Sequence, residues 1–392
     1  MIITEFDQSL FLAEYWQKKP CVIRGFIKSF VDPIDEHELA GLAQEPDIDS
    51  RIVSYSNQQW IATQGPIEDF EELCVGAWSL LVQGVDRYID EVDELTDLVN
   101  FIPNWRLDDV MISFSNEGAG VGPHTDQYDV FIIQGKGKRR WQVGLPGDYA
   151  ESIPHPLLRQ IDGFEAVIDE VLLPGDVVYI PPKHPHNGVA LSDCLNYSIG
   201  FRAPTSLEML SGLIDENRIE PAESLRYTDP DISRLRNTKD KNTNNSSAVS
   251  SNEIQKIKQL LQAFLDSESA DNALLQFLSR QSLPSDEALN ADYDSDEIKA
   301  ALLEGATLAR MTGVKPVYAQ EQSNEQFIFY IDGNEFKASK TLRAVLELML
   351  NVKEVRIGEG SDTSVDVSVL EQPDFIALVM QLVNLGYWVL LD

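Results

Sequence analysis

His124 and Asp126 stand two residues apart in GPHTDQYDVFIIQG, where a run of β-forming residues begins. Side chains two apart in a strand point to the same face, so this imidazole and this carboxylate are neighbours. Such a pair could supply two adjacent ligands to one metal ion, and a third ligand must come from elsewhere. The candidates are few, because the chain has only five histidines: His37, His124, His155, His184 and His186.

The third ligand is expected from YIPPKHPHNG, which follows EVLLPGDVVYIPP. Two histidines and one carboxylate on one side of an ion form the facial triad of non-haem Fe(II) oxygenases, which leaves positions open for a bidentate cosubstrate and dioxygen. Either His184 or His186 could close the triad in principle. We predict His186, because PHNG places it at the start of a returning strand, and we expect His184 at the mouth of the site or facing solvent.

A 2-oxo acid cosubstrate also needs a group that holds its distal carboxylate, and a planar guanidinium does so bidentately. The candidates are three consecutive cations, Lys138, Arg139 and Arg140. Arg139 alternates in phase with Trp141, and we place both on the inward face, with the other two cations outward. Ser113 and Asn196, on other β runs, are predicted to add hydrogen bonds to the cosubstrate.

Each of these signals is weak alone. A lone HxD motif occurs often by chance, a KRR run is typical of a solvated strand edge, and a histidine after prolines is typical of a turn. Their combination favours a metal site. His37 and His155 lie in polar surroundings and are expected at the surface.

The elements around these residues indicate a jelly roll. From Asn104 onward short β runs alternate with Gly and Pro, which is typical of a barrel or a two-sheet jelly roll. The first part of the chain reads as mixed helix and strand, with helices expected at 9–20 and near 70–98 and a strand in CVIRGF. The fold class is therefore mixed α/β.

The C-terminal half reads as helices with one hairpin. Helices are predicted at 206–217, 254–280, 296–311, 341–350 and 373–385, and YWVLL reads as a strand. The polar stretch at 237–253 reads as a linker, and FIFYIDGNEFKAS reads as a strand–turn–strand with Asp332-Gly333 at the turn. Helices plus a hairpin resemble a winged helix. From Asp296 onward the chain has 15 acidic and 8 basic residues, so we expect protein contact there rather than DNA contact.

Composition limits the partners and the compartment. The chain has 392 residues, 31 Lys+Arg and 64 Asp+Glu, a net charge of −33, so direct nucleic-acid binding is not expected and a basic partner is favoured. Its three cysteines are far apart, which fits a reducing compartment. No signal peptide is recognised, and no run reaches the roughly 18 apolar residues of a membrane span. We expect a cytoplasmic protein without membrane contact.

Several motifs resemble a known family. FLAEYWQKKPCVIRG resembles the N-terminal entry of JmjC-type, cupin-like oxygenases. GPHTDQYDVFIIQGKGKRRWQVG, PGDVVYIPPKHPHNGVA and NYSIGFRAP resemble the bacterial ribosomal oxygenases, which are 2-oxoglutarate- and iron-dependent arginyl hydroxylases of large-subunit ribosomal protein sixteen. The resemblance covers nearly the whole chain. It implies a jelly-roll (double-stranded β-helix) catalytic domain over 1–205, a helical dimerisation region over 206–290 and a winged-helix-like domain over 291–392.

The resemblance also implies roles for individual residues. The iron ligands of the family fall on His124, Asp126 and His186, and its 2-oxoglutarate-binding arginine falls on Arg139. Ser113 and Asn196 match positions near the cosubstrate. The implied reaction uses Fe(II), 2-oxoglutarate and dioxygen to hydroxylate the β-carbon of one arginine in a basic ribosomal protein. A homodimer built through residues 206–280 is implied as well.

Some positions depart from the family pattern or leave its substrate contacts open. His184 stands where a non-ligating residue, often an aromatic one, is expected. The sequence leaves open whether His184 competes with the predicted ligands for the metal. Glu117, in SNEGAGVGPH, could meet the guanidinium of an arginine substrate, and Tyr128 and Asp129 are weaker candidates.

Two alternative functions are a JmjC-type lysine demethylase, with the same metal and cosubstrate, and a non-catalytic cupin-like binding module that holds a metal for structure. A structural site usually fills its coordination sphere, so an open triad favours an enzyme.

Overall fold

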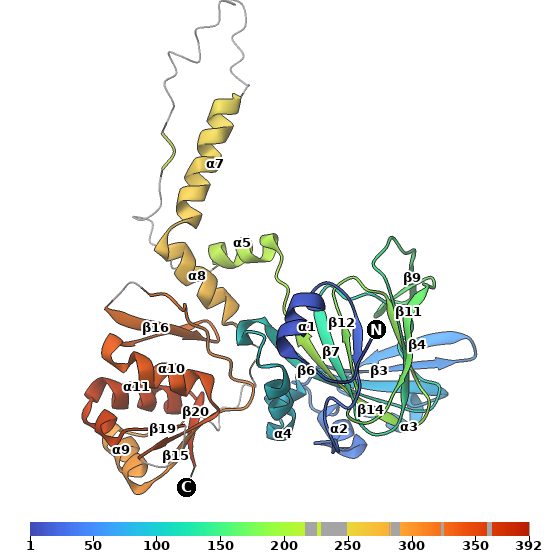
Figure 1. Ribbon diagram of the computed structural model, residues 1–392, viewed down its shortest axis with the longest axis horizontal. Coiled ribbons are helices and arrows are strands. Elements are labelled where there is room, and N and C mark those ends of the chain that lie inside the picture. Colours follow the sequence, from blue (N-terminus) through green and yellow to red (C-terminus); the bar gives the residue numbers. More distant parts are fainter. Residues whose placement is uncertain are drawn as a thin grey trace, which may run out of the picture. The chain divides into compact units, whose positions relative to one another are not determined.

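The computed structural model describes residues 1–215, 226–228, 249–281, 283, 291–322, 325–358 and 363–391. The chain forms two compact units (Figure 1). The first comprises Met1–Ala203, Ser282–Lys315 and Thr341–Asp392, and the second comprises Pro204–Gln281 and Pro316–Lys340. No described helix has both the length and the apolar character needed to cross a bilayer.

The first unit is built on a large sheet of nine strands in the order β1-β2-β12-β7-β14-β6-β5-β3-β4. Three neighbouring strands of its interior, β12, β7 and β14, are buried along their whole length. The strands are β1 (Ile2–Ile3), β2 (Cys21–Ile23), β3 (Ser50–Ser56), β4 (Gln59–Gln64), β5 (Ala77–Val82), β6 (Leu107–Ser115), β7 (Asp129–Gln134), β12 (Val177–Ile180) and β14 (Cys194–Phe201).

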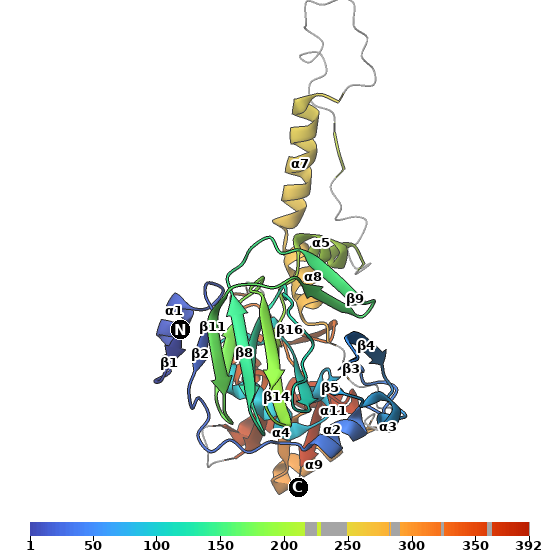
Figure 2. The same cartoon turned by 90° about the vertical axis from the view of Figure 1, so that its right-hand side faces the viewer.

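A smaller antiparallel sheet packs on this large sheet. Its order is β11-β8-β13, from β8 (Arg139–Gly144), β11 (Ala166–Leu172) and β13 (His186–Ala190) (Figure 2). A shared apolar cluster joins the sheets, with Val130 and Ile132 from the large sheet and Trp141 and Val143 from the small one. The predicted two-sheet jelly roll is confirmed.

The other face of the large sheet carries the main core of this unit. Phe11 of α1 (Gln8–Glu14) packs there on Phe131 and Tyr179, and Leu39 of α2 (Glu36–Leu42) belongs to the same cluster. The helix predicted over 9–20 is too long, because Tyr15 caps α1 and Gln17 takes a positive φ of 57°.

The helix predicted near 70–98 is wrong over much of that range. The structure has only short helices there, with strand β5 paired to β3 and β6 between them. AWSLLV is a short apolar run, and periodicity alone cannot tell such a run from a helix. The short helices are α3 (Phe70–Leu73), α4 (Asp90–Asp93) and the 3-10 segments η1 (Val85–Arg87) and η2 (Glu94–Val99).

The C-terminal residues of the first unit form a four-stranded sheet with three helices. The predicted helix over 296–311 ends at Glu304, because Gly305 adopts a left-handed φ of 102° and a strand follows. The predicted helices near 341–350 and 373–385 and the final strand are confirmed. The elements are α9 (Ser295–Glu304), β15 (Thr307–Arg310), α10 (Arg343–Asn351), β18 (Glu354–Ile357), β19 (Ser364–Val365), α11 (Pro373–Asn384) and β20 (Trp388–Leu391), with strand order β19-β18-β15-β20.

The described residues of the second unit form three helices and the predicted hairpin. Asp332 and Gly333 take φ values of 46° and 73° between β16 (Gln326–Ile331) and β17 (Asn334–Ser339), as a two-residue type I′ turn requires. Leu213 of α5 (Ser206–Asp215) packs with α8 (Glu268–Leu278).

The helix predicted over 254–280 is instead two helices, α7 (Ser251–Leu265) and α8, because Ser267 caps the second one. Of the linker predicted at 237–253, residues 237–248 lie outside the described part of the chain. Residues 251–253 form the first turn of α7, capped by Ser250.

Candidate active site

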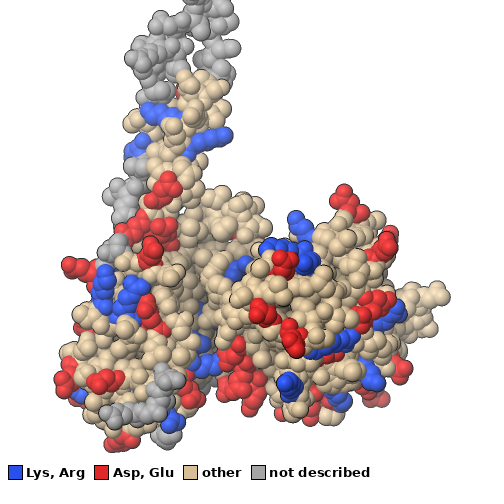
Figure 3. Space-filling model, in the orientation of Figure 1, with Lys and Arg blue, Asp and Glu red and all other residues tan. Residues whose placement is uncertain are grey.

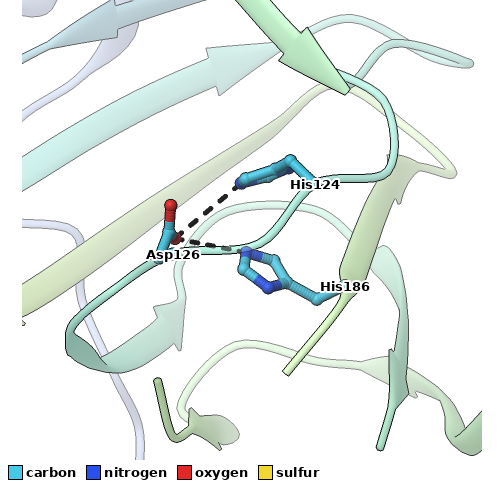
Figure 4. A group of neighbouring side chains, drawn as sticks. All are labelled: His124, Asp126 and His186. Atoms are coloured by element: carbon cyan, nitrogen blue, oxygen red, sulfur yellow. Dashed lines mark ion pairs between the residues drawn. The ribbon is translucent and has the colours of Figure 1, made fainter. Parts of the chain in front are cut away.

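His124, Asp126 and His186 come together at the end of the small sheet. The backbones of the two histidines are joined reciprocally, His124 N to His186 O at 3.0 Å and His186 N to His124 O at 2.9 Å. Asp126 Oδ2 lies 3.8 Å from His124 Nε2 and 3.5 Å from His186 Nε2 (Figure 4). One ligand atom from each residue lies within 4.8 Å of the others.

The imidazole hydrogen bonds set the character of this cluster. His124 Nδ1 lies 2.9 Å from the Gly122 carbonyl oxygen, and His186 Nδ1 lies 3.0 Å from that of His184. A carbonyl only accepts, so each Nδ1 carries the proton and each Nε2 directs a lone pair at the carboxylate. Two lone pairs and an anionic oxygen facing one another fit a divalent cation between them.

The pKa values agree with this donor set. Burial, and then His186, lowers the pKa of His124 to about 4. Burial acts to raise the pKa of Asp126, but a hydrogen bond from His186 and the charges that His124 and His186 carry when protonated outweigh it and lower that pKa to about 2. At neutral pH His124 is therefore neutral and Asp126 ionised, the states that metal ligation needs.

His184 does not belong to the cluster. Its Nδ1 lies 3.1 Å from the Pro182 carbonyl oxygen, and its side chain is absent from the group of converging ligands found in the described residues. The expectation that it lines the mouth or faces solvent is wrong, since only 5% of it is exposed. Lys183, with a φ of 65°, turns the backbone just before it.

A cavity of about 600 Å³ adjoins the triad. Both sheets of the jelly roll line it, and it opens to solvent where the exposed side chains of Tyr128 and Leu157 lie. Its lining near the triad is Ser113, Val130, Ile132, Arg139, Trp141 and Asn196.

Arg139 is a buried cation whose partners are all neutral. Its Nη1 donates to Ser115 Oγ at 3.2 Å and to Asn196 Oδ1 at 3.1 Å, and its Nη2 donates to the Gly188 carbonyl at 3.2 Å. Its Nε has no partner, and no carboxylate of the described residues lies within ion-pair distance of it. Burial lowers the pKa of Arg139, although an arginine stays protonated. A buried guanidinium left in this state fits an anionic ligand.

Strand alternation and one glycine put Arg139 in this place. Arg139 and Trp141 are buried whereas Lys138 and Arg140 are exposed, so the predicted phase is confirmed. The Arg139 guanidinium carbon lies 5.1 Å from the centroid of the Trp141 ring. A Cβ at Gly188 would come within 2.7 Å of Arg139 Nε, so only glycine leaves room for this side chain.

Ser113 and Asn196, the two further residues predicted near a cosubstrate, face each other across β6 and β14 and both line the cavity. Asn196 accepts from Arg139 and donates to Gln134 Oε1 at 2.9 Å. Sequence reasoning missed Ser115, which binds Arg139 and lies 2.7 Å from Ser79 Oγ. Its period-2 spacing from Ser113 in ISFS is a signal that could have found it.

Another part of the cavity lining is acidic. Asp108 and Asp109 of β6 lie there with Met111 and Tyr128. Asp109 Oδ2 accepts from Gly84 N at 2.8 Å. Burial, and then the charges of Asp86 and Asp108, raise the pKa of Asp109 to about 6. Sequence reasoning singled out neither aspartate, since consecutive acids before a strand are also typical of an exposed turn.

The hairpin β9 (Glu151–His155) and β10 (Leu158–Ile161) contributes Leu158 and Arg159 to the same cavity, together with Pro156 and Leu157 of its turn.

The three residues suggested for substrate contact lie in three different environments. Tyr128 lines the cavity and is 44% exposed. Glu117 is exposed and outside the lining. Asp129 is fully buried outside the cavity, where it accepts from Tyr179 Oη at 2.6 Å and pairs with Arg106 at 3.4 Å. The suggestion is wrong for Asp129, because its carboxylate is satisfied inside the core.

Comparisons with known proteins match this architecture. Residues 94–209 match the JmjC domain family, and residues 255–389 match the ROXA-like winged helix family. The chain is 38% identical over 380 residues to the ribosomal protein uL16 3-hydroxylase of Escherichia coli, covering 96% of each chain. It is 35% identical to a probable ribosomal oxygenase of Haemophilus influenzae, over 79% of this chain and 78% of that one. The solved structure of YcfD, a ribosomal oxygenase from Escherichia coli, in complex with cobalt and 2-oxoglutarate superposes with a TM-score of 0.83 at 35% identity and 99% coverage of both chains.

Replacing His186 by alanine is expected to remove metal binding, because one of three converging ligands is lost. The affinity for Co(II), measured by calorimetry, should fall by more than the roughly 10–100-fold typical of losing a residue that only orients a ligand. His184→Ala is the matched control, two residues away and outside the cluster, and should stay within a few-fold of the parent protein. Equal losses in the two variants would contradict this assignment.

Proposed function

The chain belongs to the JmjC-type ribosomal oxygenases, and we propose that it hydroxylates the β-carbon of one arginine in ribosomal protein uL16. It is a dioxygenase that uses Fe(II), 2-oxoglutarate and dioxygen. One observation carries the proposal: a single cavity is lined by an open His–Asp–His cluster, a buried guanidinium with no carboxylate of the described residues in ion-pair distance, and the half-buried carboxylate of Asp109.

In this proposal His124, Asp126 and His186 hold the iron, and Arg139 binds the distal carboxylate of 2-oxoglutarate. Ser113 and Asn196 border the same pocket and supply further polar contacts. When bound, Fe(II) supplies the oxidative chemistry in which 2-oxoglutarate and dioxygen yield succinate, carbon dioxide and one oxygen atom for the substrate C–H bond.

The other contributions of the chain are binding, orientation and the exclusion of water. Arg139 and Asn196 hold one end of the cosubstrate. The orientation of its reacting end is thereby fixed. The side chains of Val130, Ile132 and Trp141 give the pocket apolar walls that keep solvent from the reacting groups.

Asp109 is the residue best placed to recognise an arginine substrate. It lines the same cavity as the triad, and a carboxylate pairs with a guanidinium through two parallel hydrogen bonds. Asp108 adds negative charge and Tyr128 adds a hydroxyl. A cationic side chain offsets the charge of the Asp109 carboxylate, which a neutral or apolar side chain cannot do, and this gives selectivity for a cation.

The net charge of −33 favours capture of a basic protein such as a ribosomal protein. On the face in Figure 3, Lys and Arg side chains lie among Asp and Glu side chains rather than in a separate basic area. We therefore propose no direct nucleic-acid contact. We place the enzyme in the cytoplasm, where its ribosomal substrate is made, and its three cysteines are free.

We also propose a homodimer through the helices after the jelly roll. Leu207, Leu210 and Ile214 of α5 are 72%, 46% and 76% exposed. Ile254, Ile257 and Leu261 of α7 are 45%, 42% and 59% exposed. In each helix the spacing puts the three side chains on one face, and an apolar face of this kind requires a partner surface, which a second copy supplies.

The proposed division is a catalytic domain over 1–205, a helical dimerisation region over 206–290 and a winged-helix-like domain over 291–392.

The substrate assignment is tested by incubating uL16 with the enzyme, Fe(II) and 2-oxoglutarate. One arginine-containing peptide should gain the mass of a single oxygen atom, with an equal amount of succinate released. His186→Ala is the inactive control. Loss of methyl groups from a methyl-lysine substrate, without oxygen on any arginine, would favour the demethylase alternative.

The role of Asp109 predicts a particular pH dependence. Only the ionised carboxylate attracts a guanidinium, so kcat/KM for an arginine peptide should fall as the pH decreases through about 6 and level off above it. Asp109→Asn should lower kcat/KM at pH 8 by roughly 10–100-fold, the range for a hydrogen bond to a charged group, and should remove the step near pH 6. The KM for 2-oxoglutarate should not change. Glu117→Gln, exposed and outside the cavity, is the control, and an equal effect there would refute the role of Asp109.

The dimer is tested with a charge on the apolar face. Ile214→Asp should convert the protein to a monomer in analytical ultracentrifugation, since an ionised carboxylate cannot be buried against apolar side chains without a partner. Leu303→Asp, on the exposed side of α9, should leave the sedimentation unchanged. A parent protein that sediments as a monomer would contradict the proposal.

A further inference from the structure

Lys315 comes from the C-terminal part of the first unit, yet it reaches the wall of the catalytic cavity. Only 7% of the residue is exposed. Its Nζ lies 3.1 Å from Asp86 Oδ2 and 2.8 Å from the carbonyl oxygen of Asp108. The cavity described above does not include Lys315 in its lining, so the lysine acts from behind the wall.

The residues before Lys315 fit closely against the segment that carries Asp86. Gly313 has a φ of 75°, and a Cβ there would lie 3.0 Å from the Cα of Arg87. The Thr312 hydroxyl hydrogen-bonds to the carboxylate of Asp90, and Val314 is buried. These contacts fix the backbone from which Lys315 extends.

Lys315 and Asp86 together hold both peptide groups that flank Asp109. Lys315 binds the carbonyl of the preceding residue, and Asp86 Oδ1 accepts from the amide of the following one, Val110 N, at 2.7 Å. Asp86 is fully buried. The amide of Gly84, next to the same 3-10 segment, holds the carboxylate of Asp109 itself.

We propose that Lys315 is a positioning residue for substrate recognition: it fixes Asp109 in the cavity wall and neutralises the buried carboxylate of Asp86 behind it. The inference rests on the proposed role of Asp109 in binding the substrate guanidinium. According to this inference, the C-terminal part of the chain is necessary for substrate affinity. Lys315 itself does not contact the substrate.

The charges around Asp109 explain why a cation is needed at this place. Asp86 and Asp108 disfavour its ionisation, whereas Arg87 favours it. Arg202 is also close enough to interact with it, and so is the Tyr128 phenol. Without Lys315 the charge of Asp86 would act on Asp109 uncompensated, and Asp109 would be more often protonated at neutral pH.

Lys315→Met tests this, since it removes the charge and keeps much of the side-chain volume. The acid limb, which is the fall of kcat/KM for an arginine peptide at low pH, should move to higher pH by about one unit. This is the lower end of the range of pKa shifts that a charge within a few ångströms causes. At pH 6 the KM for the peptide should rise about five-fold, because the ionised fraction of Asp109 falls by this factor there, and at pH 8.5 it should approach that of the parent enzyme. The kcat at saturating peptide and the KM for 2-oxoglutarate should stay unchanged.

Asp86→Asn supplies an independent variant with the opposite expectation, because it removes the negative charge and leaves Lys315 in place. Its acid limb should move to lower pH. The double variant, Lys315→Met with Asp86→Asn, should return close to the parent profile. If Lys315→Met does not fold, Lys315→Gln supplies the same test, because it also removes the charge and keeps a donor for the carbonyl oxygen of Asp108.

A purely structural role for Lys315 would lower the melting temperature and leave the acid limb in place in Lys315→Met, and that result would overturn the inference. The proposed function fails separately. If Asp109→Asn does not change the KM for the peptide, guanidinium binding by Asp109 is wrong and the inference falls with it. If Asp109→Asn has its expected effect and the two charge variants do not shift the limb, only the inference about Lys315 is wrong.

Discussion

The buried, uncompensated guanidinium of Arg139 is the constraint on which the rest of the site depends. Removing a cation from water is costly unless an anion and hydrogen bonds replace the solvent, and the acceptors found for Arg139 among the described residues, on Ser115, Asn196 and Gly188, are neutral. In the proposed function a ligand supplies the missing negative charge, and 2-oxoglutarate does so through its distal carboxylate. The absence of a Cβ at Gly188 belongs to the same arrangement, because a methyl group there would push Arg139 away.

The jelly roll sets the geometry between this cation and the metal ligands. Strand β13 provides both His186 and Gly188, and its neighbour β8 provides Arg139 and Trp141. The reciprocal backbone hydrogen bonds between His124 and His186 then fasten the loop that carries Asp126 to the end of β13. The distance between Arg139, the proposed cosubstrate anchor, and the triad is thus fixed by strand register rather than by a mobile loop.

Local periodicity predicted correctly the features that depend on neighbouring residues, such as the inward phase of a strand. It failed where contacts between distant segments determine the local structure. The inward phase of Arg139 and Trp141 and the turn at Asp332-Gly333 both follow from neighbouring residues. The helix expected near 70–98 does not form throughout, because AWSLLV pairs with β3 and β6. The burial of His184 was missed, because it depends on how the PPKHP turn folds back.

Asp109 and Lys315 could not be found from sequence for the same reason. Each has an ordinary local context, and their importance comes from segments about two hundred residues apart meeting behind one wall of the cavity.

The most direct test of the central claim is calorimetric titration of 2-oxoglutarate into the protein loaded with Co(II), for the parent chain and for Gly188→Ala. The added methyl group should displace Arg139 and weaken 2-oxoglutarate binding by about tenfold or more, as overpacking of a tight site does, while the Co(II) affinity stays the same. Gly200→Ala is the control, because the nearest atom to its added Cβ would be 3.6 Å away, which is an ordinary van der Waals contact. Unchanged 2-oxoglutarate affinity in Gly188→Ala would show that Arg139 does not anchor the cosubstrate, and would contradict the account.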